Sequence, residues 1–351
     1  MHAIRLYSIL CLSLTITLPS DCLWAANKPS TLAELAFYKG SDRQQILEEG
    51  AKKEGNLLVY TTGTTALTAI AEAFKKKYPF IKVDFWRSSG GPLVSRTTEE
   101  FKAGSYIMDL MDTTQTNQEF VSRMGIFQNF NSPNFAQMED EAKTLAPGDK
   151  GTRVLFRTYG IGFGYNTKLL SKEQLPKSYQ DLTDPKWKGK LAIAGSNTGA
   201  CWVRAIQHSY SDDLLNKIAA QNFPVQVMSA QALLGLVQSG EYVGSPTLVD
   251  ANVYGLRLTG ASVGWVPLEP AWGQADSIGI AKYAPHPCAA LLFADFEYSK
   301  EAGEIHRSFG YSSLRKDVAP VTQRYKKYYG NGTMEEVTEG LETFQRLFVR
   351  K

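Results

Sequence analysis

The stretch LLVYTTGTTALTAIAEAFKKKYPFIKVDFWRSSGGPLVSRTTEEF, residues 57–101, determines the fold class. Its short apolar run over 57–60 predicts a buried strand, and the loop 61–65 leads into a helical pattern over 66–78. A strand over 80–86, a polar loop over 88–92 and a helix through Phe101 repeat this order. Residues 107–111 predict a third strand, and a helix to Met124 follows. Such alternation predicts a parallel sheet with a ligand crevice at the carboxyl ends of its strands.

The second half of the chain repeats this order and predicts a second α/β unit. Strand patterns over 153–165 and 191–194 are followed by the polar loop 195–199 and a helix toward His208. A strand over 224–228 and a helix over 230–239, ended by Gly240, continue the series. Helical patterns over 288–298 and from Glu335 come last. Apparent crossings between the two units lie near 129–151 and 254–279.

Length and composition limit the class of protein. The 351 residues are 43% hydrophobic and 21% charged, which is typical of a globular chain with two compact lobes. Lys and Arg number 38 against 35 Asp and Glu, so the net charge is only +3. No broad basic face, and therefore no nucleic-acid partner, is expected.

The first 25 residues predict a secretory signal. Arg5 precedes an apolar run over 6–18, which is shorter than the roughly 20 residues of a membrane-spanning helix. Small residues fit cleavage after Ala25. A lipid anchor on Cys22 is the alternative, although the acidic residue before it fits lipoprotein processing poorly. We therefore expect a soluble mature protein outside the cytoplasm.

Two cysteines remain after removal of the signal, Cys201 and Cys288. In an oxidising compartment a single pair is a candidate disulfide. Two separately buried thiols are the alternative. The sequence leaves both interpretations open.

The motifs of common enzymes are absent from the sequence, and we expect neither catalysis nor a cofactor. No HExxH, G-x-S-x-G or P-loop pattern occurs. Three loops instead combine hydroxyls with glycine at strand-to-helix turns, where free N–H groups favour an anion. The candidate ligand-binding residues in these loops are Thr61, Thr62, Thr64, Ser88, Ser89, Gly90, Ser196, Asn197 and Thr198. Helix capping alone is the alternative. Arg157 lies in an apolar run and requires a carboxylate from the protein or from a ligand.

Five segments carry a resemblance that covers nearly all of the mature chain. They are EGNLLVYTTGTT (54–65), AIAEAFKKKYPFIKVDFWRSSGG (69–91), GFGYNTKLL (162–170), DPKWKGKLAIAG (184–195) and APHPCAALLFADFEYSKEAGE (284–304). The series resembles the periplasmic solute-binding proteins of ABC importers, in the ferric-iron-binding branch of extracellular solute-binding family 1. The resemblance implies an α/β fold of type II, two lobes around a ligand cleft, and a monomer that delivers its ligand to a membrane permease. It places lobe 1 at 26–130 plus about 275–310, and lobe 2 at about 131–274 plus 311–351.

The same resemblance indicates where an iron ligand set would lie. Iron-binding members use two adjacent tyrosines, and only Tyr254 of the pair Val253-Tyr254 matches. The histidine position falls near Thr64 and the glutamate position near Thr113 or Thr114. Fe(III) prefers phenolate and carboxylate oxygens, which these threonines do not supply. We therefore expect a small anionic organic solute of the carboxylate, phosphonate or phosphate type. The alternatives are ferric iron or an iron complex, an extracytoplasmic enzyme on the same scaffold, and a sensory ligand-presenting protein.

Overall fold

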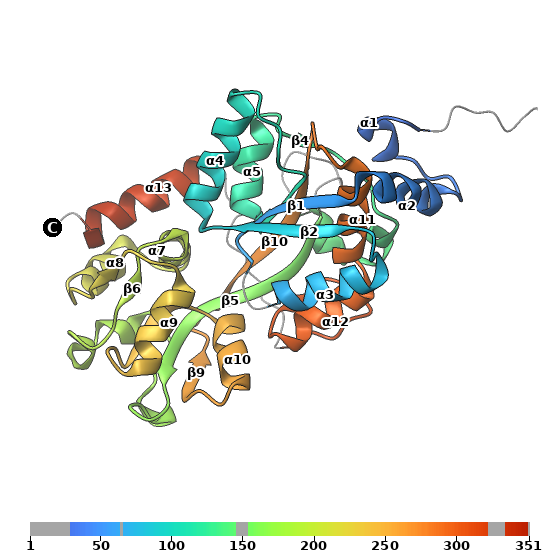
Figure 1. The fold of residues 1–351 in the computed structure, drawn as a ribbon. Helices are drawn as coiled ribbons and strands as arrows, with labels where there is room; N and C mark the ends of the chain where they lie inside the picture. The colour runs from blue at the N-terminus through green and yellow to red at the C-terminus, as the bar shows by residue number, and fades with distance from the viewer. Residues whose placement is uncertain (1–28, 64–65, 145–153, 322–333, 350–351) are drawn as a thin grey trace, which may run out of the picture.

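The computed structural model describes residues 29–63, 66–144, 154–321 and 334–349. The predicted signal 1–25 and Thr64 lie outside these ranges. The described chain folds into two groups of helices and strands, joined by two long strands that run through the middle of the molecule (Figure 1).

Lobe 1 is built on the parallel strands that the first stretch of sequence predicts. Strand β1 (Asn56–Thr61) lies between β2 (Lys82–Arg87) and β3 (Leu110–Thr114) and pairs in parallel with both. The strands are followed in turn by α3 (Leu67–Lys77), α4 (Gly90–Lys102) and α5 (Gln115–Arg123). The three predicted strand–loop–helix units are therefore confirmed, with bounds that differ by a few residues.

The remaining elements of lobe 1 cover the sheet and close its core. They are α1 (Leu32–Leu35), α2 (Arg43–Glu54), β4 (Phe127–Gln128), η2 (Pro133–Gln137), α6 (Asp140–Thr144), α11 (Pro287–Glu297), α12 (Lys300–Ser308) and β11 (Ser312–Ser313). Gly55 ends α2 with a φ of 69°, a left-handed conformation that glycine adopts without strain. One apolar cluster packs α2, α3 and α11 on the sheet, and a second includes Leu93 of α4 and Val121 of α5. Burial on both faces explains why the strand sequences read as apolar runs.

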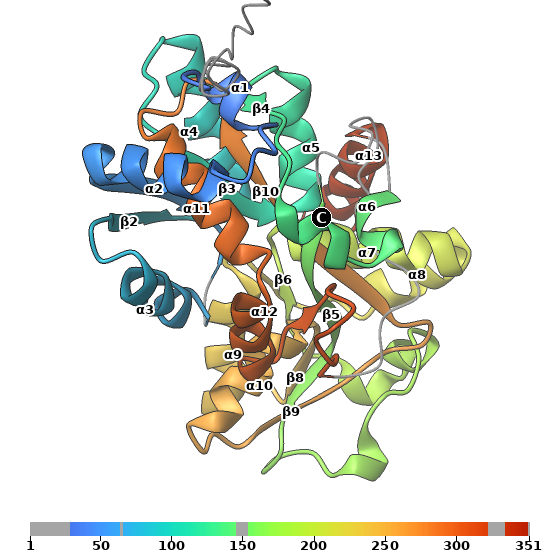
Figure 2. The ribbon, with the colours of Figure 1, turned by 90° about the vertical axis from the view of Figure 1, so that its right-hand side faces the viewer.

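Lobe 2 combines short strands with helices. Its strands are β6 (Ile193–Ala194), β7 (Val225–Gln226), β8 (Gly244–Val249) and β9 (Val263–Val266). Its helices are α7 (Asn197–Ser209), α8 (Asp212–Ala219), α9 (Ala230–Ser239), α10 (Asp250–Leu258) and α13 (Met334–Phe344), with the short turns η3 (Lys172–Gln174), η4 (Gln180–Thr183), η5 (Pro185–Trp187) and η6 (Gln345–Val349). The predicted helices at 230–239 and near the carboxyl terminus are confirmed. Figure 2 shows α13 beside α7, far in sequence but adjacent in space.

The two lobes are joined by the antiparallel strands β5 (Leu155–Asn166) and β10 (Trp272–Ala281), which are buried along their whole length. Leu155 and Phe156 of β5 pack into the core of lobe 1, whereas Ile161 and Phe163 pack into the core of lobe 2. The first crossing is therefore β5 and lies after the segment 129–151 that the sequence indicated. The second crossing, β10, falls inside and just beyond the range 254–279.

The core clusters bear on where the chain divides into lobes. Phe135, Met138 and Ala142 pack with lobe 1, although the sequence interpretation ended that lobe at 130. Leu314 also packs with lobe 1, whereas Phe344 packs with lobe 2. We propose a first boundary within β5, near residue 158. Among the described residues, no helix combines the length and the apolar character needed to cross a membrane.

Candidate functional site

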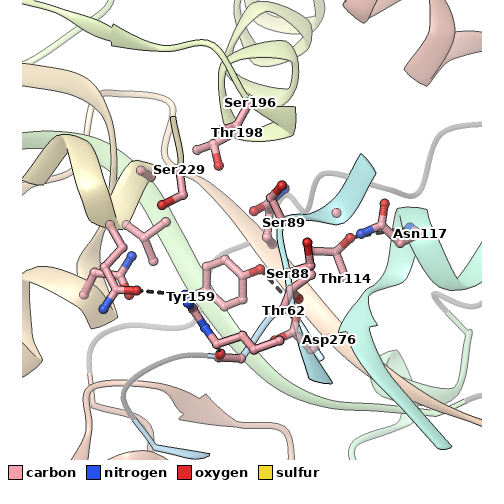
Figure 3. Close-up of a pocket in the computed structure, with 18 of the residues that line it drawn as sticks. Thr62, Ser88, Ser89, Thr114, Asn117, Tyr159, Ser196, Thr198, Ser229 and Asp276 are labelled. Carbon is pink, nitrogen blue, oxygen red and sulfur yellow. Dashed lines mark hydrogen bonds between the residues drawn. The ribbon is translucent and has the colours of Figure 1, made fainter. Parts of the chain in front are cut away.

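A pocket of about 360 Å³ lies where the strand ends of lobe 1 face the helix starts of lobe 2 (Figure 3). Residues from both lobes and from the two crossing strands line it. Its hydroxyl-bearing residues are Thr62, Ser88, Ser89, Thr114, Ser196, Thr198, Ser229, Tyr159 and Tyr311. A small polar molecule would therefore meet donors on several sides at once.

Four helices with a hydroxyl-bearing N-cap residue begin at this pocket, in addition to α10, whose N-cap is Val249. Their N-cap residues are Ser89 for α4, Thr114 for α5, Ser196 for α7 and Ser229 for α9, and all four line the pocket. The first N–H groups of a helix have no partner within the helix, and the helix dipole places partial positive charge at that end. Four such ends directed at one cavity favour an anion there.

The four N-cap hydroxyls differ in whether they cap their own helix. Ser229 accepts a hydrogen bond from the Ala232 N–H at 3.2 Å, and Thr114 accepts one from the Asn117 N–H at 3.4 Å. Ser89 and Ser196 make no side-chain capping bond. The Ser196 hydroxyl oxygen is buried and has no hydrogen-bond partner among the described residues. Capping therefore accounts for Ser229 and Thr114, and leaves Ser89 and Ser196 available to a ligand.

Arg87, at the end of β2, adds a positive charge to the pocket. Its Nε donates to the Gly63 carbonyl at 2.7 Å, and its Nη2 donates to the Gln231 side-chain oxygen at 3.0 Å. Gln231 belongs to α9, so this second bond joins lobe 1 to lobe 2. No carboxylate of the described residues forms a salt bridge with Arg87, and its charge is uncompensated there.

Arg157, by contrast, has its charge balanced by the protein. Its Nε donates to Asp276 at 2.7 Å, and its Nη2 donates to both oxygens of Asp112 at 3.2 Å. The Tyr159 hydroxyl donates to the other Asp276 oxygen at 3.1 Å. The sequence left open whether protein or ligand supplies the carboxylate of Arg157, and the structure supplies two from the protein.

A buried acid and a histidine extend this ion network, here defined as Asp112, Arg157, Asp276, Glu297 and His306. His306 pairs through Nε2 with Glu297 at 2.7 Å, and its Nδ1 lies 3.4 Å from Arg157 Nη1. Burial raises the pKa of Glu297 to about 7 and that of Asp112 to about 6. Burial, with the Arg157 charge, lowers the pKa of His306 to about 3, so this histidine is neutral at neutral pH.

The structure brings together seven of the residues selected from the sequence and separates others. Those that line the pocket are Thr62, Ser88, Ser89, Gly90, Arg157, Ser196 and Thr198. Thr61 and Thr113 are buried behind it, because Thr61 donates to Asp112 and Thr113 bonds to Thr62 and Asn117. Asn197 begins α7, but its side chain, like Thr64, is outside the described part.

Tyr254 does not line the pocket, which corrects its place in the candidate site. It lies on α10, with 36% of its surface exposed, and packs against Gly310. The sequence match to an iron-ligand position therefore falls on a helix face outside the cavity. Among the described residues, no three His, Cys, Asp or Glu side chains gather to hold a metal ion.

Of the two interpretations that the sequence left open for the cysteines, the structure has the separate thiols, because Cys201 and Cys288 are both free. Cys201 packs in the core of lobe 2, and Cys288 packs in the core of lobe 1. Gln274 donates a hydrogen bond to the Cys201 sulfur at 3.1 Å. Each thiol therefore belongs to a different core.

Several pocket residues were missed by sequence reasoning. Ser229 lies at a strand-to-helix turn like the selected loops, and Arg87 directly precedes Ser88. The pattern used to select those loops could therefore have identified both residues. Gln274 and Asp276 lie on the crossing strand β10, where no local pattern marks them.

Comparison with known proteins places the chain in a family. A profile of bacterial extracellular solute-binding proteins matches residues 107–329. The chain belongs to this family. A Salmonella typhimurium protein named as a candidate 2-aminoethylphosphonate-binding periplasmic protein is 26% identical over 263 residues, which cover 70% of this solute-binding protein and 73% of the relative.

Solved structures confirm the fold. The periplasmic binding protein AfuA of Actinobacillus pleuropneumoniae, with fructose-6-phosphate bound, has a TM-score of 0.70 at 20% identity, covering 85% of this chain and 99% of AfuA. Iron-bound HitA of Pseudomonas aeruginosa has a TM-score of 0.68 at 19% identity, covering 83% of this chain and 99% of HitA. The predicted two-lobed periplasmic binding protein fold of type II is therefore confirmed.

Proposed function

We propose that this solute-binding protein captures a small anionic organic solute and delivers it to the membrane permease of an ABC importer. The observation that carries the proposal is the meeting of four helix N-termini, from both lobes, at one pocket. Partial positive charges at these ends and the uncompensated Arg87 would hold a carboxylate, phosphonate or phosphate group.

The two serines without a capping bond supply further donors. Ser89 belongs to lobe 1 and Ser196 to lobe 2, so an acidic group held by both would tie the lobes together. A hydrogen bond to a charged group contributes about 1.5–3 kcal/mol, which is larger than a bond between neutral groups. Ligand binding would thus favour the closed arrangement of the lobes.

The relatives support an anionic ligand without identifying it. The Salmonella relative is named for a phosphonate, and AfuA was solved with a sugar phosphate. Both ligands carry a phosphorus-centred acid of the class that helix N-termini accept. Family membership and the predicted signal at 1–25 support a periplasmic location for the mature chain.

A binding role rather than catalysis is the natural use of this pocket. Its Arg157 and Asp276 are engaged with each other and with Asp112 and Tyr159, so they are held in fixed structural contacts. The members of the matched family are solute-binding proteins. We propose that this chain works as a monomer without enzymatic activity and without a resident cofactor.

Ferric iron is the alternative ligand. The positions of the tyrosines favour an organic anion over iron. Fe(III) binds phenolate oxygens, but burial and the adjacent Asp276 raise the pKa of the Tyr159 hydroxyl, which keeps it protonated. Tyr254 lies outside the pocket. Titration with ferric citrate separates the two cases, because tyrosinate-bound iron colours a protein.

The function is tested by calorimetric titration of the purified protein with propylphosphonate, inorganic phosphate and the uncharged 1-propanol. We expect heat of binding from at least one anion and none from propanol. Arg87→Gln removes the uncompensated charge and should weaken anion binding by about tenfold or more. Binding of propanol as strongly as propylphosphonate, or binding of neither anion, would refute an anionic solute.

A further inference from the structure

Helix N-termini and a carboxylate line different parts of the pocket. Figure 3 shows Ser196 and Thr198 at one end of the drawn residues and Asp276 at the other. The end at Ser196 carries helix N-termini, which are partly positive. Asp276 is a carboxylate that lines the same cavity although only 3% of its surface is exposed.

Asp276 retains capacity to bind a donor from a ligand. Its two oxygens each accept one hydrogen bond from the described residues, from Arg157 Nε and from the Tyr159 hydroxyl. A carboxylate offers about four acceptor positions, so roughly half remain. These open positions belong to a residue that borders the cavity, where a solute group can reach it.

Charge in the ion network around Asp276 also favours an added cation. Asp112, Asp276 and Glu297 supply three carboxyl groups, whereas Arg157 supplies the single permanent positive charge. His306 faces Arg157 and Glu297 and is neutral. Buried carboxylates that outnumber their cations are costly, and an ammonium group beside Asp276 would restore the balance.

We propose that Asp276 binds a cationic amino group of the solute, so that the preferred ligands are short zwitterions. This inference rests on the proposed function, since the acidic group is held at the helix N-termini and by Arg87. The ligand class is then an aminoalkyl phosphonate, phosphate or carboxylate. The Tyr159 hydroxyl and Arg157 orient the Asp276 carboxylate toward the cavity.

A matched pair of phosphonates tests this on the unmodified protein. 2-Aminoethylphosphonate and propylphosphonate have the same length and differ by an ammonium in place of a methyl group. We expect 2-aminoethylphosphonate to bind at least tenfold more tightly in calorimetric titrations at one pH and one salt concentration. Equal affinity, or tighter binding of propylphosphonate, overturns the amine site and leaves the anionic-solute function standing. Binding of neither phosphonate also overturns the amine site, and the proposed function is refuted as well if inorganic phosphate does not bind.

Two variants test whether Asp276 causes the preference for 2-aminoethylphosphonate over propylphosphonate. Asp276→Asn should reduce the affinity ratio of the two phosphonates to about one. Asp112→Asn is the matched control, because Asp112 pairs with the same Arg157 but does not line the pocket. This control should keep most of the preference. A ratio unchanged in Asp276→Asn, or lost equally in both variants, would show that Asp276 does not contact the amine.

Discussion

Replacing Ser89 by alanine distinguishes ligand binding from helix capping at the pocket. Ser89 is the N-cap of α4 and lines the cavity, but its side chain makes no capping hydrogen bond. A hydrogen bond to a charged ligand group contributes about 1.5–3 kcal/mol, and each 1.4 kcal/mol is about tenfold in affinity. We therefore expect Ser89→Ala to weaken propylphosphonate binding by roughly one to two powers of ten, with little change in melting temperature.

Ser299→Ala is the matched control, because Ser299 caps α12 and is not among the residues that line the pocket. Its hydroxyl accepts a hydrogen bond from the Ala302 N–H at 3.2 Å. Loss of such a cap costs about 1 kcal/mol of stability, which lowers the melting temperature of a large domain by about 2–4 °C. The affinity for propylphosphonate should be unchanged.

The assay is calorimetric titration combined with thermal melting, run on the wild type and both variants. The two substitutions remove the same atom, so they differ only in where the hydroxyl lies. If Ser89→Ala lowers the melting temperature as Ser299→Ala does and leaves affinity intact, the α4 hydroxyl is structural. The site would then have to be sought from Ser196 and Thr198.

Three further predictions concern the buried groups. Burial raises the pKa of Glu297 from 4.5 to about 7, so the folded protein loses stability as pH rises through that window and the buried carboxyl ionises. In urea unfolding, the free energy of unfolding of Glu297→Gln should therefore rise relative to that of the wild type by on the order of 2 kcal/mol between pH 5 and 8. A difference between the two proteins that does not change with pH would contradict this. Removing Arg157 leaves buried carboxylates unpaired, so Arg157→Met should cost about 3–5 kcal/mol in the same assay, and a loss below 1 kcal/mol would contradict the ion network. Burial raises the pKa of Cys201 and of Cys288 to about 12. Both thiols should therefore react slowly with Ellman's reagent in the native protein and fully in guanidinium. A thiol that is missing after denaturation without reductant would indicate a disulfide bridge.

Local sequence patterns were enough to predict the units of the fold and part of the site. The strand–loop–helix order around 57–101 and the hydroxyls of Ser88, Ser89, Ser196 and Thr198 are signals within one short segment. Each depends on periodicity and capping chemistry, which act between near neighbours in the chain. The positions of the two crossings were less accurate, because β5 and β10 are buried on all sides and carry no alternation.

The residues that the sequence could not supply depend on pairing between distant strands. Asp276 lies opposite Arg157, and Gln274 opposite Tyr159, only through the antiparallel register of β10 on β5. A shift of one residue would turn these side chains to the other face of the sheet. The sequence left the cysteine pairing open for the same reason, since the cores that receive Cys201 and Cys288 are decided by the whole fold.

The hydrogen bond from Arg87 to Gln231 has a consequence for how fast the solute enters. It joins β2 of lobe 1 to α9 of lobe 2, and both residues line the pocket. We expect this contact to open before solute enters, in a step whose rate is independent of solute concentration. In stopped-flow mixing the observed association rate should therefore level off as propylphosphonate is increased, and Gln231→Ala, which removes the acceptor, should raise that plateau.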